Sequence, residues 1–259
     1  MNTHEPPESF TAVHEPDLFT AVYEGDEDTV VRLLRSGVSP ESADAEGQTA
    51  LYAAAVGDAP GVVRLLLAAG ADPDRLSAGA DAPLCGAACG GHTDVVRALL
   101  AAGAAPDLEE EYGFRALTWA VRRGCAEVVR VLLAAGADPD LPGPSGEFPL
   151  VAAARRGSPG CVRALVDHGA RGRDEALAEA RRWAGLDVAA ELRAGLEAAH
   201  GPGHEYVTRR WEEEPGTVTV EVSLLREGRP GAGDDMQTGH AAIVDLLAAG
   251  GGTAGAPGR

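Results

Sequence analysis

Two pairs of adjacent arginines are the side chains in this sequence best suited to bind a ligand. Arg122 and Arg123 form the first pair, and Arg155 and Arg156 follow 33 residues later. A guanidinium group presents a planar fork of N–H donors that fits a carboxylate with two parallel hydrogen bonds. Because the chain has a net charge of −18, a local group of arginines is out of character with its surroundings. We interpret the two pairs as candidate contacts for carboxylates of a partner.

The cysteines and histidines give weaker signals. Cys85 and Cys89 are four residues apart, but no third and fourth ligand lie nearby in the sequence, as a structural zinc site requires. His200 and His204 have the spacing of a helical metal-binding pair, but Gly-Pro-Gly lies between them and breaks that geometry. We therefore expect no metal site and no cofactor. All four cysteines are expected to be small apolar core residues: Cys85, Cys89, Cys125 and Cys161.

The sequence also lacks the common catalytic motifs. It contains no phosphate-binding glycine loop after a strand, no G-x-S-x-G elbow and no H-E-x-x-H motif. We therefore predict that the protein is not an enzyme. One alternative stays open, in which the C-terminal segment 201–259 acts on substrates that the rest of the chain recruits.

A repeated structural unit must position these side chains, because much of the chain repeats every 33 residues. The segment VVRLLLAAGADPD from Val62 returns as VVRALLAAGAAPD from Val95 and as VVRVLLAAGADPD from Val128. A fixed period of this length is typical of stacked supersecondary units. Two series of residues keep the same step: Leu18, Leu51, Leu84, Leu117 and Leu150, and Gly37, Gly70, Gly103, Gly136 and Gly169.

Each unit is predicted to contain two helices. In the second unit, Leu51 and Ala54 lie on one face of a first helix, and Val62 and Leu66 lie on one face of a second. Gly70 then ends the second helix as a left-handed cap. The acidic segments between units, such as residues 44–47, are predicted to form tight hairpin-like fingers that lead into the next helix pair.

This pattern resembles the ankyrin repeat family. The matching segments are GQTALYAAA (47–55), APLCGAACGGH (82–92), FPLVAAARRG (148–157) and the LLxxGAxPD endings, so that the resemblance covers residues 18–170 in five units. It implies an all-α solenoid of helix-turn-helix units with short β-hairpin fingers. It also implies a non-enzymatic interaction module or scaffold that binds another protein through its concave groove.

The chain is predicted to have three parts. Residues 1–16 form a disordered N-terminal arm, because they are polar and rich in proline. Residues 17–200 form the repeat domain, in which a helix pair within 171–200 caps the array. Residues 201–259 form a small α/β appendage with two strand-like segments (205–211 and 217–225), a linker (228–239), one helix (239–250) and a flexible tail.

The resemblance also implies where a partner binds. In ankyrin repeats the finger tips and the last exposed turn of each first helix line the concave face, and binding hot spots are rich in arginine and aromatic residues. The alternative is that the arginines only neutralise the acidic residues at 109–111 and 147. The predicted partner-binding residues are Tyr112, Phe114, Arg122, Arg123, Glu147, Arg155 and Arg156, with the partner offering acidic side chains or a C-terminal carboxylate.

The composition restricts the partners further. A net charge of −18 disfavours nucleic acid and anionic membranes, and no run of about 18 apolar residues is present to span a bilayer. The N-terminus lacks the apolar stretch of a secretory signal, and all 22 basic residues are arginine, as in proteins from GC-rich bacterial genomes. We expect a cytoplasmic bacterial monomer. An alternative function is that of an inhibitor or immunity-type protein that neutralises an enzyme or toxin through its acidic surface.

Overall fold

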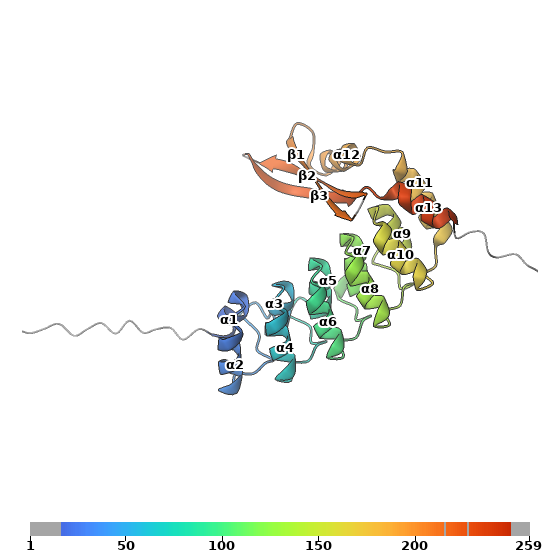
Figure 1. The fold of residues 1–259 in the computed structure, drawn as a ribbon. Helices are drawn as coiled ribbons and strands as arrows, with labels where there is room; N and C mark the ends of the chain where they lie inside the picture. The colour runs from blue at the N-terminus through green and yellow to red at the C-terminus, as the bar shows by residue number, and fades with distance from the viewer. Residues whose placement is uncertain (1–16, 215, 227, 250–259) are drawn as a thin grey trace, which may run out of the picture.

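The computed structural model describes residues 17–214, 216–226 and 228–249, so the predicted N-terminal arm and C-terminal tail lie outside the described residues. Helix pairs stack side by side, with the first helices in one layer and the second helices in another (Figure 1). The predicted solenoid of helical repeats is confirmed. Units one to five contain α1 (Leu18–Glu24) and α2 (Glu27–Arg35), α3 (Ala50–Val56) and α4 (Pro60–Ala68), α5 (Pro83–Gly90) and α6 (Thr93–Ala101), α7 (Ala116–Arg123) and α8 (Ala126–Ala134), and α9 (Pro149–Arg156) and α10 (Pro159–Asp167).

The core of the solenoid is built from small and branched aliphatic residues that return at the same positions. Alanines on the first helices let neighbouring helices approach closely, and leucines on the second helices fill the space between units. Because each unit buries its apolar face on its neighbours, the core runs along the whole array. The fully buried positions are Ala54, Ala87, Ala120 and Ala153 on the first helices, and Leu66, Leu99, Leu132 and Leu165 on the second.

The fingers between units are short. The finger at 43–49 closes through one antiparallel bridge between Ala43 and Thr49. The finger before α7 contains a single 3-10 turn, Glu111–Gly113, in which Tyr112 adopts a left-handed conformation with φ of 67°. Both fingers lead directly into the first helix of the next unit, α3 and α7 respectively.

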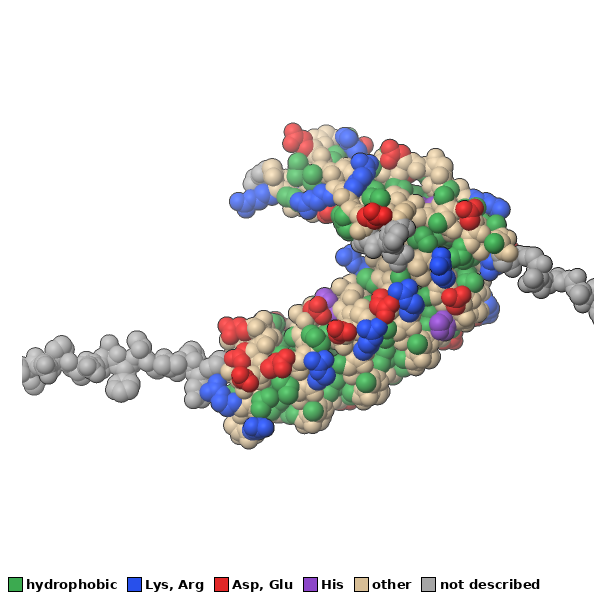
Figure 2. Space-filling view, in the orientation of Figure 1, with side chains coloured by type: hydrophobic (Ala, Val, Ile, Leu, Met, Phe, Trp, Pro, Cys, Tyr) green, Lys and Arg blue, Asp and Glu red, His purple; other side chains and the backbone are tan. Residues whose placement is uncertain are grey.

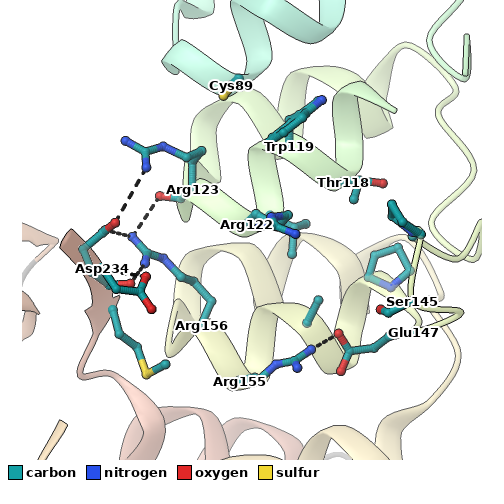
Figure 3. Close-up of a pocket in the computed structure, with 17 residues that line it drawn as sticks. Cys89, Thr118, Trp119, Arg122, Arg123, Ser145, Glu147, Arg155, Arg156 and Asp234 are labelled. Carbon is teal, nitrogen blue, oxygen red and sulfur yellow. Dashed lines mark hydrogen bonds and ion pairs between the residues drawn. The ribbon is translucent and has the colours of Figure 1, made fainter. Parts of the chain in front are cut away.

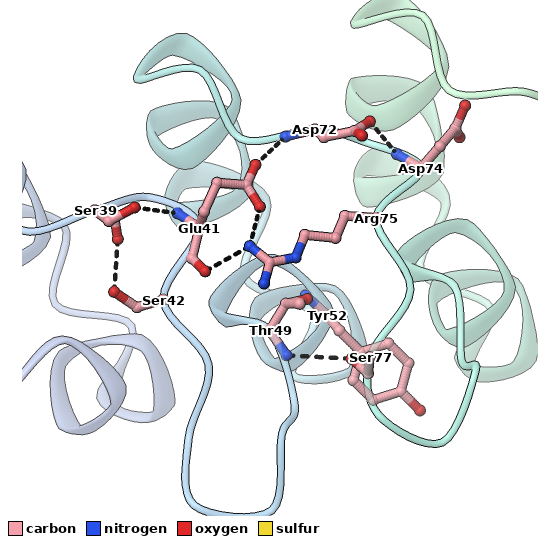
Figure 4. A network of polar contacts seen from close by, with 9 residues as sticks. All are labelled: Ser39, Glu41, Ser42, Thr49, Tyr52, Asp72, Asp74, Arg75 and Ser77. Carbon is pink, nitrogen blue, oxygen red and sulfur yellow. Dashed lines mark hydrogen bonds and ion pairs between the residues drawn. The ribbon is translucent and has the colours of Figure 1, made fainter.

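A ladder of carboxylates joins the loops that follow the second helices. In each rung, an acidic side chain accepts a hydrogen bond from the backbone N–H of the residue 31 positions further on. Figure 4 shows the first rung, where Glu41 also pairs with the guanidinium of Arg75. The repeated Pro-Asp endings of the sequence thus have a physical role between units. The rungs are Glu41 to Asp72, Asp74 to Ala105, Asp107 to Asp138, and Asp140 to Arg171.

The last rung predicts a pH-dependent stability. The backbone N–H and guanidinium of Arg171 hold the pKa of Asp140 below its ordinary value. Such a carboxylate stabilises the fold above its unfolded pKa of about 3.9, and this contribution is lost as the pH falls through the lower folded pKa. We expect Asp140→Asn to lower the free energy of unfolding by about 1–2 kcal/mol at pH 7.

Urea unfolding of both chains at several pH values tests this prediction. The difference in free energy between the original chain and Asp140→Asn should shrink as the pH falls below the unfolded pKa of about 3.9 and the carboxylate becomes protonated. A difference that stays constant from pH 7 to pH 2 would show that the charge of Asp140 contributes nothing.

The array contains a sixth unit whose two helices are far apart in the sequence. Its first helix is α11 (Arg173–Ala184), which packs on α9, and its second helix is α13 (His240–Ala249), which packs on α11 and α10. The predicted capping pair within 171–200 is therefore wrong, because α11 pairs with α13 and not with α12 (Val188–His200). The helix that the sequence placed in a separate appendage belongs to the solenoid.

Contacts at equivalent positions support this assignment. In α13, His240 Nε2 lies 3.0 Å from the backbone carbonyl oxygen of Arg155, just as His92 Nε2 lies 3.1 Å from that of Val56. Burial lowers the pKa of His240, so its neutral ring donates this hydrogen bond. The apolar positions correspond as well, and all four are buried: Ile243 and Leu247 in α13, Val95 and Leu99 in α6.

Residues 185–239 are consequently an insert within the sixth unit. The insert contains α12 and three antiparallel strands in the order β1-β2-β3: β1 (Glu205–Glu214), β2 (Thr217–Arg226) and β3 (Arg229–Gln237). The predicted linker at 228–239 is wrong, because β3 occupies it. The segment RPGAGDDMQ is rich in residues that strands disfavour, and it pairs with β2 through backbone hydrogen bonds that composition does not reveal.

The insert has a hydrophobic core of its own. On α12, Val188, Leu192 and Leu196 pack against Val220 and Val222 of β2, in a cluster separate from the core of the solenoid. The sheet projects back over the units that precede it (Figure 1), and the space-filling view shows a deep notch between the insert and the N-terminal units (Figure 2). The insert therefore forms one arm of a C-shaped molecule.

Candidate functional site

A pocket of about 640 Å³ lies where the insert meets the solenoid. Its walls come from α7, α9, the finger at 143–147 and β3, and both arginine pairs line it (Figure 3). Five of the seven predicted partner-binding residues are thus brought together in one pocket. They are Arg122, Arg123, Glu147, Arg155 and Arg156.

Arg122 is held by aromatic rings rather than by a carboxylate. Phe114 and Trp119 stack with ring centroids 4.4 Å apart, and the guanidinium carbon of Arg122 lies 5.5 Å and 5.7 Å from the two centroids. Within the described residues, the ion pairs of the two arginine pairs involve Arg123, Arg155 and Arg156 but not Arg122. Cation–π contacts orient the guanidinium and leave its N–H donors able to bind a carboxylate.

The aromatic wall is itself fixed by a hydrogen-bonded carboxylate. Trp119 Nε1 donates to Glu110 Oε2 at 2.8 Å, and Glu110 Oε1 accepts the backbone N–H of Ala82 at 2.8 Å. Glu110 thus joins the finger of unit four to unit three. The position of Arg122 is therefore set by its neighbours before any ligand is present.

Arg155 is neutralised locally. Its guanidinium pairs with Glu147 of the neighbouring finger, while 44% of the arginine side chain stays exposed. The alternative interpretation of the sequence, that the arginines only neutralise nearby acids, describes Arg155 well. Among residues 109–111, however, Glu109 pairs with Arg115 and Glu110 bonds Trp119, so these acids serve other side chains.

Arg123 and Arg156 are engaged by the chain itself. The carboxylate of Asp235 on β3 pairs with Arg156, which is only 9% exposed, and lies 3.6 Å from Arg123. Arg156 also donates to the backbone carbonyl of Asp235 and, at 3.4 Å, to that of Arg123. Two of the four arginines predicted to meet a partner therefore meet a carboxylate of the insert in this structure.

The other two predicted residues lie outside the pocket lining. Phe114 acts through its contacts with Trp119 and Arg122. Tyr112 stands at the tip of its finger and is 78% exposed. It is free to touch a large partner that extends beyond the pocket.

Sequence reasoning missed several pocket residues. Trp119 carried a usable signal, because the equivalent positions of other units hold Ala53, Gly86 and Ala152, so it is one large aromatic residue among small ones. Asp234, Asp235 and Met236 carried none, because they come from the segment that was interpreted as a linker.

In the described part of the chain, no group of three or more His, Cys, Asp or Glu residues could hold a metal ion. None of its helices has both the length and the apolar character needed to cross a membrane. Cys85 and Cys161 are buried, as the core assignment expects, and burial raises the pKa of the Cys85 thiol; Cys89 lines the pocket.

Comparison with protein-family models gave a match. A family model described as ankyrin repeats, in three copies, matches residues 18–82 and 60–143. These residues cover units one to four, whereas unit five, the split sixth unit and the insert lie beyond the match. A search of curated proteins found no similar protein.

Proposed function

Since this chain belongs to the ankyrin repeat family, whose arrays are protein–protein interaction modules, we propose that it binds a partner protein in the pocket between units four and five and β3. One observation carries the proposal. Arg122 is exposed in the pocket, is held against Phe114 and Trp119, and has no carboxylate partner among the described residues. The recognised group is a carboxylate of the partner, either an acidic side chain or a chain terminus.

Recognition at Arg122 combines two contributions. The aromatic wall offers apolar surface of the kind that dominates binding hot spots. The guanidinium offers a bidentate fork in a partly enclosed site, where a charged hydrogen bond is worth about 1.5–3 kcal/mol. A carboxylate placed here therefore contributes roughly a tenfold to hundredfold gain in affinity.

Charge reversal at Arg122 tests the proposal. We expect a partner captured from a lysate by the original chain, and identified by mass spectrometry, to be lost or weakened at least about tenfold by Arg122→Glu, because the carboxylate then faces a like charge. Arg64→Glu is the matched control, since Arg64 is an exposed arginine on the outer helix α4 and lies far from the pocket lining.

The measurement after capture is the dissociation constant of the purified partner with each of the three chains. If the partner binds Arg122→Glu as tightly as it binds the original chain, the pocket is not the binding site. If that partner is also strongly basic, the result favours the other function considered, in which the acidic surface neutralises an enzyme or toxin.

A further inference from the structure

Two of the pocket arginines, Arg123 and Arg156, already face a carboxylate in this structure. The insert supplies it, in the place where a partner's carboxylate would bind. Asp235 uses both its carboxylate and its backbone carbonyl on Arg156, and the same carboxylate faces Arg123. Arg156 is the more buried of the two, so its charge needs a partner at all times. Figure 3 shows β3 closing this side of the pocket.

We infer that an acidic, extended segment of the partner competes with Asp235 for Arg123 and Arg156, so that the insert is an intrachain competitor for part of the binding site. This inference rests on the proposed function for the place where the partner binds. The chemistry of the partner follows from the contact already present. Asp235 lies on an edge strand, so the arginines recognise a carboxylate together with a carbonyl of extended backbone.

The insert is built to leave the arginines without unfolding. Its core, formed by α12 and β2, is separate from the core of the solenoid, so a movement of the whole insert exposes neither. A cavity of about 270 Å³ lies between α12 and the sheet on one side and α11 and α13 on the other. The chain enters and leaves the insert through two short segments, 185–187 and 238–239.

Polar contacts help to hold β3 on the solenoid. Besides the ion pairs of Asp235, they include the placement of Gln237 over the bare backbone of Gly124 and Gly157, and, just after β3, the backbone hydrogen bond from Gly239 to Gly157. The strand residues before Asp234 are exposed. Salt screens the more exposed pair with Arg123 more strongly than the buried pair with Arg156. A charged competitor can therefore replace the Asp235 contact without disrupting buried apolar packing.

The experiment uses a peptide with the sequence of residues 229–238, RPGAGDDMQT, as the probe. In the full chain, Asp235→Asn frees Arg123 and Arg156 from their carboxylate, while Asp234→Asn removes the same charge from the neighbouring position, whose side chain accepts the backbone N–H of Asp235. We expect fluorescence anisotropy to show that the labelled peptide binds Asp235→Asn roughly tenfold more tightly than it binds the original chain or Asp234→Asn. The same peptide with asparagine in place of both aspartates should not bind.

Two results would overturn the inference. One is equal affinity of the peptide for the original chain and for Asp235→Asn, and the other is equal binding of the aspartate and asparagine peptides. These outcomes are independent of Arg122→Glu, which tests the proposed function and leaves Arg123 and Arg156 unchanged.

A second measurement on the unmodified chain covers the case in which Asp235→Asn does not fold. Adding the peptide in excess to the unmodified chain should increase amide hydrogen exchange at Gly239, whose N–H donates to Gly157 across the contact, and leave exchange in α3 to α8 unchanged. Exchange at Gly239 that does not respond to the peptide would also overturn the inference.

Discussion

Alanine at Gly157 is expected to destabilise the chain by about 2–5 kcal/mol and to push the insert away from unit five. Gly157 ends α9 in a left-handed conformation with φ of 78°, which costs an alanine about 1–2 kcal/mol. An added Cβ would also overlap the backbone carbonyl oxygen of Gln237 and lie 2.6 Å from His240 Cε1. Backbone atoms cannot give way as a flexible side chain can, so the clash adds to the conformational cost.

Gly25 provides the matched control for this prediction. It ends α1 with a similar φ of 67°, but nothing lies within 4 Å of the position that its Cβ would take. Gly25→Ala should therefore cost only the conformational term of about 1–2 kcal/mol. Urea unfolding followed by circular dichroism gives both values, and equal losses for the two variants would mean that β3 and α13 do not pack on Gly157.

The Leu99→Ala variant is expected to lose about 2–5 kcal/mol of stability. Leu99 on α6 is completely buried, and α6 packs between α4 and α8. Truncating Leu99 therefore leaves a cavity where unit three meets its neighbouring units. Because stability in a repeat array depends on the interfaces between adjacent units, this loss affects both sides of the array.

Arg97→Ala, two residues away on the same helix, is the control for Leu99→Ala. Arg97 is 52% exposed and pairs with Asp94 and Glu127 on the surface. Exposed ion pairs contribute about 0.2–1 kcal/mol, so Arg97→Ala should cost less than about 1 kcal/mol. Similar losses for both variants in urea unfolding would contradict the assignment of the buried face of α6.

The array could be predicted from the sequence because every unit repeats the same local pattern at the same step. The sixth unit could not, because its two helices are separated by the insert, so the 33-residue step is lost after Gly169. The segment GHAAIVDLLAAG has the pattern of a second helix, but only the packing of α13 on α11 shows which first helix it completes.

The candidate site shows the same division between local and long-range information. The arginine pairs lie in equivalent positions of two adjacent units, so their proximity could be predicted from the repeat. In the structure both pairs line one pocket. The contact between Arg156 and Asp235 joins residues 79 positions apart through a strand without alternating hydrophobicity. No local pattern in the sequence indicates such a pairing.

The split sixth unit has a consequence for the order in which the protein is made. Domains fold as their segments leave the ribosome, from the N-terminus onwards. Helix α11 is synthesised long before α13, so the end of the array stays incomplete until residues 240–249 emerge. The insert is thus translated while unit five still exposes the surface that α13 later covers.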